Sequence, residues 1–353
     1  MKNSLQAKPD LNSTIQKTLL TSMLFEGFWD RWVAHGIDEN AVSEIRPQLK
    51  SVENWIEVLN KCAEDYEKQG SYFQDKRLFY KAESAYRLAG LHYNLIQWIF
   101  PESGIVKQKW YARCKDSFNK ADAISSHDIL NTLISVEDHY CYGRIRIPPN
   151  PKGCVIIINP IDSSKEELFT YESDFANLGF LTVSFDGPGQ GETYVRNQYT
   201  ATSERWNLFL NRVIEYTAEQ YPELGIYLFG TSSGGAWVIH GSRHPKVIKA
   251  VSVSPACEND ELKMPDYFKE RMSYILEDYE KGLLPKLEEF EGYKPILMFH
   301  GNKDVMVKEE DIYQLYDHLP KGKRLIEYKS EGHCCNYKLG EIRKVSAGWF
   351  LED

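Results

Sequence analysis

The pattern G-x-S-x-G spans residues 230–234, with Ser232 at its centre. An apolar run at 226–229 precedes it and a helical pattern from Ala236 follows it, which predicts a sharp turn between a strand and a helix. Such a turn lifts a serine hydroxyl above the sheet and aims the N-terminal N–H groups of the helix at the same spot. The alternative is a glycine-rich helix entry without catalysis. The placement favours a nucleophile that forms a covalent acyl intermediate.

A serine hydroxyl attacks only when a base takes its proton, and the base needs an orienting acid. Asp304 lies in the loop after the apolar run 295–299, and His333 lies shortly after the run 324–328. In a parallel sheet both loops fall on the edge that carries Ser232, in the chain order Ser, Asp, His. We therefore predict a catalytic triad with Ser232 as nucleophile, His333 as general base and Asp304 as orienting acid.

Other histidines and aspartates in the region are weaker candidates. His300 is expected inside a strand end. Asp311, Asp317 and His318 are expected on a solvated helix face near 308–319. His240 and His244 are expected at the far end of the helix that Ser232 opens.

The oxyanion hole should use the N–H of Ser233 and one N–H from the loop after the apolar run 154–158. Pro160 has no N–H, which leaves Ile161 or Asp162. We take Ser233 and Ile161 as the predicted donors. Residues 163–166 look like an N-cap that opens the next helix.

A glycine loop at 185–192, Phe-Asp-Gly-Pro-Gly-Gln-Gly-Glu, resembles a phosphate cradle only superficially. It lacks the Gly-Lys-Ser/Thr ending of a P-loop, so it is interpreted as a structural turn beside the site.

Alternating strands and helices from about residue 128 predict an α/β fold, a mostly parallel sheet with helices on both faces. An antiparallel pair at 133–136 and 142–147 opens it. Before it, helical spacing is expected from Ser51 to a stop at Gly70, from Ala82 to Phe100 and over about 106–123. We predict a helical N-terminal domain at 1–125 and a hydrolase domain at 126–353. The charged, aromatic stretch 257–293 is predicted to be a short helical lid.

Composition excludes several other classes of protein. The chain has 353 residues, 42% of them hydrophobic, which supplies a core, and a net charge of −9, which disfavours nucleic acid. Its seven cysteines show neither a disulfide framework nor zinc spacing, and no signal peptide or membrane span is apparent. We expect a cytoplasmic enzyme with no metal or cofactor and a small-molecule carbonyl or ester substrate. Whether it is a homodimer stays open.

With these motifs in view, the chain resembles the FrsA-like branch of the α/β-hydrolases. The resemblance rests on DSSKEE at 162–167, FDGPGQGE at 185–192, the G-x-S-x-GG turn, HGNKD at 300–304 and GHCC at 332–335. RWVAHGID at 31–38 and the Ala/Tyr-rich helices resemble the helical N-terminal domain of that family. The chain departs from the family at Asn159-Pro160, where Gly-Gly is usual.

The resemblance implies an α/β-hydrolase fold and the triad of Ser232, Asp304 and His333. The family includes enzymes that cleave C–C bonds in 1,3-dicarbonyl or aryl-ketone substrates, some of which shorten polyketide chains, and also simple esterases. C–C bond hydrolysis through an acyl-enzyme is the leading hypothesis. A carboxylesterase or thioesterase with the same triad is the alternative, and a non-catalytic binding protein of this fold is a third.

Overall fold

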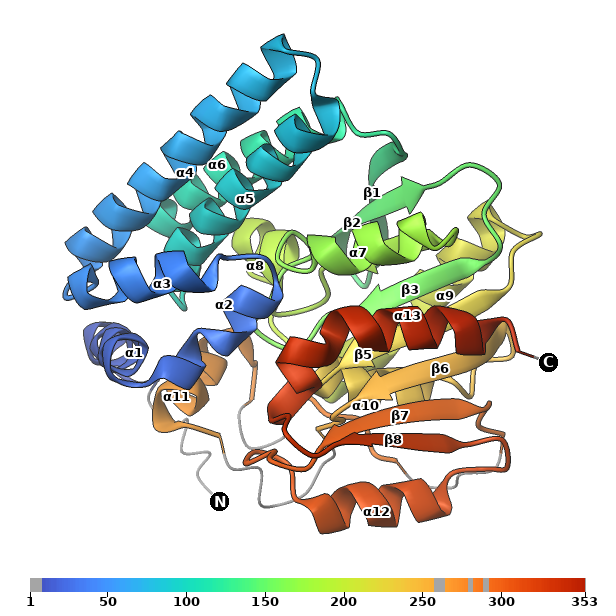
Figure 1. Cartoon of the computed structure of the whole chain (residues 1–353). Helices are drawn as coiled ribbons and strands as arrows, with labels where there is room; N and C mark the ends of the chain where they lie inside the picture. Colours follow the sequence, from blue (N-terminus) through green and yellow to red (C-terminus); the bar gives the residue numbers. More distant parts are fainter. Residues whose placement is uncertain (1–7, 257–263, 279–281, 288–291, 353) are drawn as a thin grey trace.

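The computed structural model describes residues 8–256, 264–278, 282–287 and 292–352. The N-terminal third is helical, with α4, α5 and α6 side by side in Figure 1. The helices of this part are α1 (Leu11–Leu24), α2 (Asp30–Ala34), α3 (Glu39–Ile45), α4 (Val52–Asp75), α5 (Phe79–Trp98) and α6 (Ile105–Asp122).

The long helix α4 begins as predicted, because the Ser51 hydroxyl accepts the Asn54 N–H at 3.2 Å. The predicted stop at Gly70 is wrong, since α4 continues to Asp75. A Cβ atom at position 70 would lie 2.6 Å from the Tyr86 ring. Gly70 therefore permits the close approach of α5 and does not end the helix.

An eight-stranded sheet follows, in the order β1-β2-β4-β3-β5-β6-β7-β8. Pairing is antiparallel from β1 to β2 and from β2 to β4, and parallel across the rest. This confirms the predicted α/β class and the opening antiparallel pair. The strands are β1 (Asp128–Val136), β2 (His139–Ile147), β3 (Cys154–Ile158), β4 (Leu181–Phe185), β5 (Ile226–Thr231), β6 (Val247–Val253), β7 (Ile296–Gly301) and β8 (Arg324–Tyr328).

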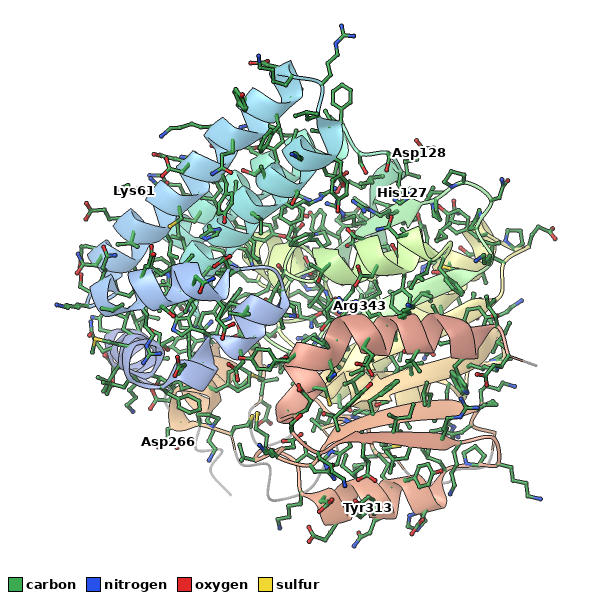
Figure 2. The ribbon with its side chains drawn as sticks, in the orientation of Figure 1. Lys61, His127, Asp128, Asp266, Tyr313 and Arg343 are labelled. Carbon is green, nitrogen blue, oxygen red and sulfur yellow. The ribbon has the colours of Figure 1, made fainter. Side chains whose placement is uncertain are left out.

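Helices cover both faces of the sheet, because the central strands are apolar on both sides (Figure 1). One face packs on α7 (Phe169–Asn177) and α13 (Leu339–Phe350). These two helices are joined by Arg343, labelled in Figure 2, whose Nε donates to Asp174 at 2.8 Å. The other face packs on α9 (Ser203–Gln220), α10 (Ser233–Gly241) and α12 (Glu309–His318).

The predicted lid at 257–293 lies partly outside the described residues, at 257–263, 279–281 and 288–291. Its described part contains α11 (Asp266–Ile275), which packs against α1. The Thr14 hydroxyl of α1 donates to Glu270 of α11 at 3.0 Å. The lid role and the domain boundary at 125/126 stay predictions.

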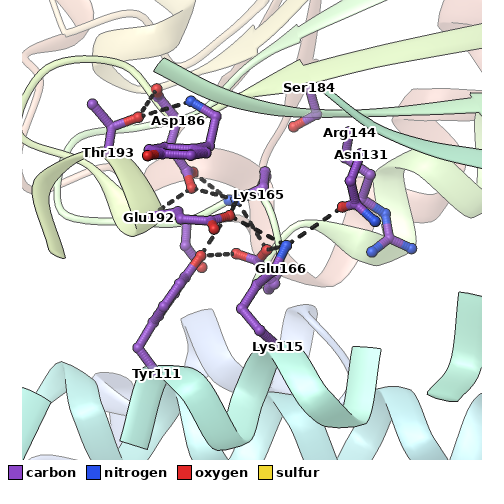
Figure 3. Close-up of polar contacts among 12 residues, drawn as sticks. Tyr111, Lys115, Asn131, Arg144, Lys165, Glu166, Ser184, Asp186, Glu192 and Thr193 are labelled. Carbon is purple, nitrogen blue, oxygen red and sulfur yellow. Dashed lines mark hydrogen bonds and ion pairs between the residues drawn. The ribbon is translucent and has the colours of Figure 1, made fainter. Parts of the chain in front are cut away.

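Residues 163–166 do not cap a helix, which corrects the prediction, because α7 begins only at Phe169. Within this segment, the Lys165 and Glu166 side chains lie in a buried cluster of charges between α6 and the sheet (Figure 3). Lys165 Nζ lies 2.9 Å from Asp186 and 2.8 Å from Glu192. The backbone N–H of Lys165 also donates to Asp186, at 2.7 Å. From α6, the Tyr111 hydroxyl donates to Glu166 at 2.6 Å. The cluster joins the helical region to the loops beside the sheet.

Candidate active site

Ser232 stands at the turn between β5 and α10, with φ 54° and ψ −122°. L-residues rarely adopt this conformation, so the surroundings must hold it. The Ser232 N–H donates to the Val253 carbonyl at 2.9 Å, and its own carbonyl accepts N–H groups from Ala236 and Ala256. The side chain is thereby fixed above the end of the sheet, where it is only partly buried.

The glycines of the motif are needed for close packing. A Cβ atom at Gly230 would lie 2.3 Å from the Gly234 carbonyl oxygen, and one at Gly234 would lie 2.2 Å from the Ile158 carbonyl oxygen. Real Cβ atoms do not approach so closely, so larger residues at either place would push the helix away from the strands. The G-x-S-x-G spacing therefore follows from how β3, β5 and α10 meet.

The structure brings the three predicted triad residues together. His333 Nε2 lies 2.9 Å from Ser232 Oγ, and His333 Nδ1 lies 2.8 Å from Asp304 Oδ2. Asp304 follows β7 and His333 follows β8, at the same sheet edge as Ser232. The Asp304 side chain is fully buried, whereas 16% of the His333 side chain is exposed.

The loops that carry Asp304 and His333 are tied to each other. The Lys303 N–H donates to the Glu331 carbonyl at 2.9 Å. Asp304 Oδ1 accepts the N–H groups of Met306 and Val307 at 2.8 and 3.0 Å. Those bonds set the carboxylate so that its other oxygen meets the imidazole.

Electrostatics favour an ion pair between Asp304 and His333. Burial would raise the pKa of Asp304, but His333 and the two backbone N–H groups hold it below its usual range. Burial would lower the pKa of His333, yet the Cys334 sulfur and the Asp304 carboxylate hold it well above 6.5. The site therefore stabilises an imidazolium, which is the state that follows proton transfer from a serine.

The predicted donor Ile161 lies beside the nucleophile, but its N–H already has a partner. It donates to the Ser233 hydroxyl oxygen at 2.8 Å. The two preceding carbonyls, of Asn159 and Pro160, accept the Gln190 side-chain amide at 3.0 and 2.7 Å. Gln190 belongs to the glycine loop 185–192, and its amide holds the loop 159–162, called the oxyanion loop because it carries the predicted donor Ile161. No local pattern indicated this role of Gln190, although it is the only residue with a side chain in the tripeptide Gly-Gln-Gly.

Asp162, which follows Ile161, has a left-handed φ of 58° and is held from three sides. Its carbonyl accepts from Arg31 Nη2 at 2.8 Å and from Trp98 Nε1 at 3.1 Å. Its carboxylate accepts from Arg271 Nε at 2.9 Å. Arg271 of α11 is fully buried, with its guanidinium 3.6 Å from the Trp98 ring centroid. No local sequence pattern indicated these three partners, because they come from α2, α5 and α11.

A pocket adjoins this loop and is lined by Gln97, Trp98, Lys107, Asp162 and Ser163, among others. None of the three triad residues lines it. Within the described part of the chain, no three His, Cys, Asp or Glu side chains are grouped as metal ligands would be.

The competing histidines His240 and His244 have other partners than Ser232. His240 Nε2 lies 2.9 Å from Asn207 Oδ1, and His244 Nε2 lies 2.8 Å from Glu215. His300 is buried in β7, and burial lowers its pKa. Asp311, Asp317 and His318 belong to α12, as expected.

Comparison with known proteins gives matches along most of the chain. A family model described as serine aminopeptidase, S33, matches residues 149–289. The chain is 24% identical to a 2,6-dihydropseudooxynicotine hydrolase of Paenarthrobacter nicotinovorans, over 92% of this chain and 91% of that protein. It is also 24% identical to the α/β hydrolase ucsC of an Acremonium species, over 66% of this chain but only 54% of that protein.

The crystal structure of the 2,6-dihydroxy-pseudo-oxynicotine hydrolase has a TM-score of 0.78 to this structure, at 22% identity, and the match covers 91% of this chain and 94% of that one. The chain therefore has the α/β-hydrolase fold, as predicted, and its relatives are named as hydrolases. Among the described helices none is both long and apolar enough to cross a membrane.

Proposed function

We propose that this chain, an enzyme of the α/β-hydrolase fold, is a serine hydrolase with Ser232, His333 and Asp304 as its catalytic triad. The continuous line of hydrogen bonds from Ser232 Oγ through the imidazole to Asp304 carries the proposal. A neutral imidazole can receive the serine proton at Nε2 while its Nδ1–H donates to the carboxylate. Ser232 is itself partly exposed, as a residue that meets a substrate must be.

The substrate that we favour is a 1,3-dicarbonyl or aryl ketone whose C–C bond is hydrolysed. Ser232 Oγ attacks one carbonyl carbon while His333 Nε2 takes its proton, and the Ser233 N–H stabilises the oxyanion. Collapse of this intermediate breaks the C–C bond, and its electron pair passes to an enolate from a 1,3-dicarbonyl, or to the ring carbon from an aryl ketone, which takes the proton from His333. Water, deprotonated by His333, then attacks the acyl-enzyme, and the departing Ser232 oxygen takes that proton back. A 1,3-dicarbonyl yields a carboxylic acid and a ketone, and an aryl ketone yields a carboxylic acid and an arene.

Similarity along most of the chain supports the choice of a C–C bond hydrolase. The match to the 2,6-dihydropseudooxynicotine hydrolase takes in 92% of this chain, the helical region included. We propose that the helices of 1–125 act as a cap and 257–293 as a lid, and that they select the leaving group. A carboxylesterase or thioesterase would use the same triad and is the alternative.

Substrate assays with purified protein separate these reactions. We expect aryl 1,3-diketones to yield the acid and ketone pair, and a fluorophosphonate probe to label Ser232. Ser232→Ala should lose both the labelling and about 10⁶-fold in kcat, since removal of a triad serine has cost about that much in another serine hydrolase. Ser242→Ala is a matched control, because it removes a buried hydroxyl from the far end of α10, where Ser242 bonds to the Ile239 carbonyl.

Rapid turnover of p-nitrophenyl esters with diketones left intact would exclude the C–C reaction and favour an esterase. A wild-type protein that no fluorophosphonate labels would exclude the serine hydrolase altogether.

A further inference from the structure

The Ser233 hydroxyl oxygen occupies the acceptor position of the Ile161 N–H, which a substrate oxygen would otherwise take. Its Oγ accepts that N–H at 2.8 Å, and only 3% of the residue is exposed. A hydrogen already directed at Ser233 is not free to bind a substrate carbonyl in the usual linear geometry. The Ser233 hydroxyl therefore either blocks the Ile161 N–H or donates its own hydrogen to the substrate in place of that N–H.

The hydrogen-bonding capacity of the hydroxyl distinguishes these cases. A serine hydroxyl has two lone pairs and one hydrogen to donate. Ile161 engages one lone pair, and the hydrogen has no acceptor among the described residues. Serines within helices often donate to the carbonyl four residues earlier. For Ser233 that residue is Phe229, which lies in β5 and not in the helix. Among the described residues, the hydrogen is therefore not committed to a protein acceptor.

We propose that the Ser233 hydroxyl is an oxyanion donor, with the Ile161 N–H bonded behind it. The backbone N–H and the hydroxyl belong to one residue beside the nucleophile, so both can converge on one substrate oxygen. Ile161 then acts as a positioning residue, because its N–H orients Oγ and polarises the O–H bond. No proton leaves Ser233. Its hydrogen bond only strengthens as negative charge develops on the substrate oxygen.

This inference rests on the proposed attack of Ser232 on a carbonyl, and Ser233→Ala tests it. Removing the donor should lower kcat by about 10²-fold, as for other oxyanion donors, with KM within about twofold. Affinity for a trifluoromethyl ketone, whose adduct with Ser232 carries an oxyanion, should fall by a similar factor. Ser233→Thr keeps a hydroxyl and should recover most of both losses, while Ser242→Ala should match the wild type. Thermal unfolding midpoints would show that each variant is folded.

Opposite outcomes are informative. A rise in kcat for Ser233→Ala would mean that the hydroxyl blocks Ile161, and an unchanged kcat would mean that it is structural; either overturns the proposal. If the alanine variant does not fold, Ser233→Cys replaces it with a weaker donor of similar size, and a lower kcat is again expected. A wild type without fluorophosphonate labelling would reject the serine hydrolase itself, whatever the Ser233 variants do.

Discussion

At the scale of single residues, the Asp304 carboxylate divides its two oxygens between two tasks. One oxygen accepts the backbone N–H groups that fix its loop, and the other accepts from His333 Nδ1. The acid therefore sets both the position and the proton affinity of the base. Changing it should alter rate and pH dependence together.

We expect Asp304→Asn to lower kcat by about 10³–10⁴-fold, because an amide cannot hold the imidazole in the tautomer that accepts the serine proton. The raised pKa of His333 means that the neutral base forms only well above pH 6.5, so activity of the wild type should rise with pH there. Loss of the carboxylate charge lowers that pKa, and the acid limb of the kcat/KM profile should move to lower pH. An unmoved limb would contradict the assignment of Asp304.

At the scale of elements, the oxyanion loop is held by parts of the chain that lie far from it in sequence. Arg31 of α2 and Trp98 of α5 bind the Asp162 carbonyl, and Arg271 of α11 binds its carboxylate. Asp162 has a left-handed conformation, whose energetic cost these contacts offset. The position of α11 is thereby linked to that of Ile161 and Ser233.

Arg271→Lys tests this link, because lysine keeps the charge but not the planar fork of donors. We expect kcat to fall by about 10- to 10²-fold through misplacement of the loop. Labelling of Ser232 by a fluorophosphonate should slow in parallel. Arg324→Lys is the control, since Arg324 forms an exposed ion pair with Glu352, with half of each side chain accessible. Equal kcat values for the two variants would show that Arg271 does not position the loop.

At the scale of the whole molecule, buried ion pairs join the N-terminal helices to the sheet. Glu167 is fully buried and receives Arg31 through two bonds of 2.6 and 2.7 Å. Burial alone would raise the pKa of Glu167, but Arg31 and His35 lower it from 4.5 to about 2. A carboxylate with a depressed pKa stabilises the fold above its unfolded pKa, and this stability is lost as the pH falls through the folded pKa.

The wild type should therefore lose about 3 kcal/mol of unfolding free energy from this group as the pH falls from about 5 toward 2. Glu167→Gln should be less stable at pH 7, because it removes the buried charge that pairs with the partly exposed Arg31. Its unfolding free energy should depend less on pH over the acid range. Urea midpoints at pH 7, 5, 4 and 3 measure both effects, with Glu352→Gln as an exposed control. Parallel pH curves for wild type and Glu167→Gln would contradict the role of Glu167.

The sequence by itself determined the strands, the nucleophile turn and the order of Ser232, Asp304 and His333. Strand and helix periodicity and the glycine spacing around Ser232 are local, so they can be interpreted without a fold. The side chains of Ser232, Asp304 and His333 meet because parallel strands end at one edge of the sheet. The triad distances themselves still required the structure.

Only the tertiary structure decided what surrounds the nucleophile. The partner of the Ile161 N–H, the amide of Gln190 and the guanidinium of Arg271 all depend on contacts between segments distant in sequence. The predicted helix stop at Gly70 and the predicted N-cap at 163–166 are wrong for the same reason. Their neighbours are Tyr86 on another helix and Asp186 on another loop, and no local pattern contains either. Local periodicity predicts which elements form, whereas long-range packing determines what each side chain touches.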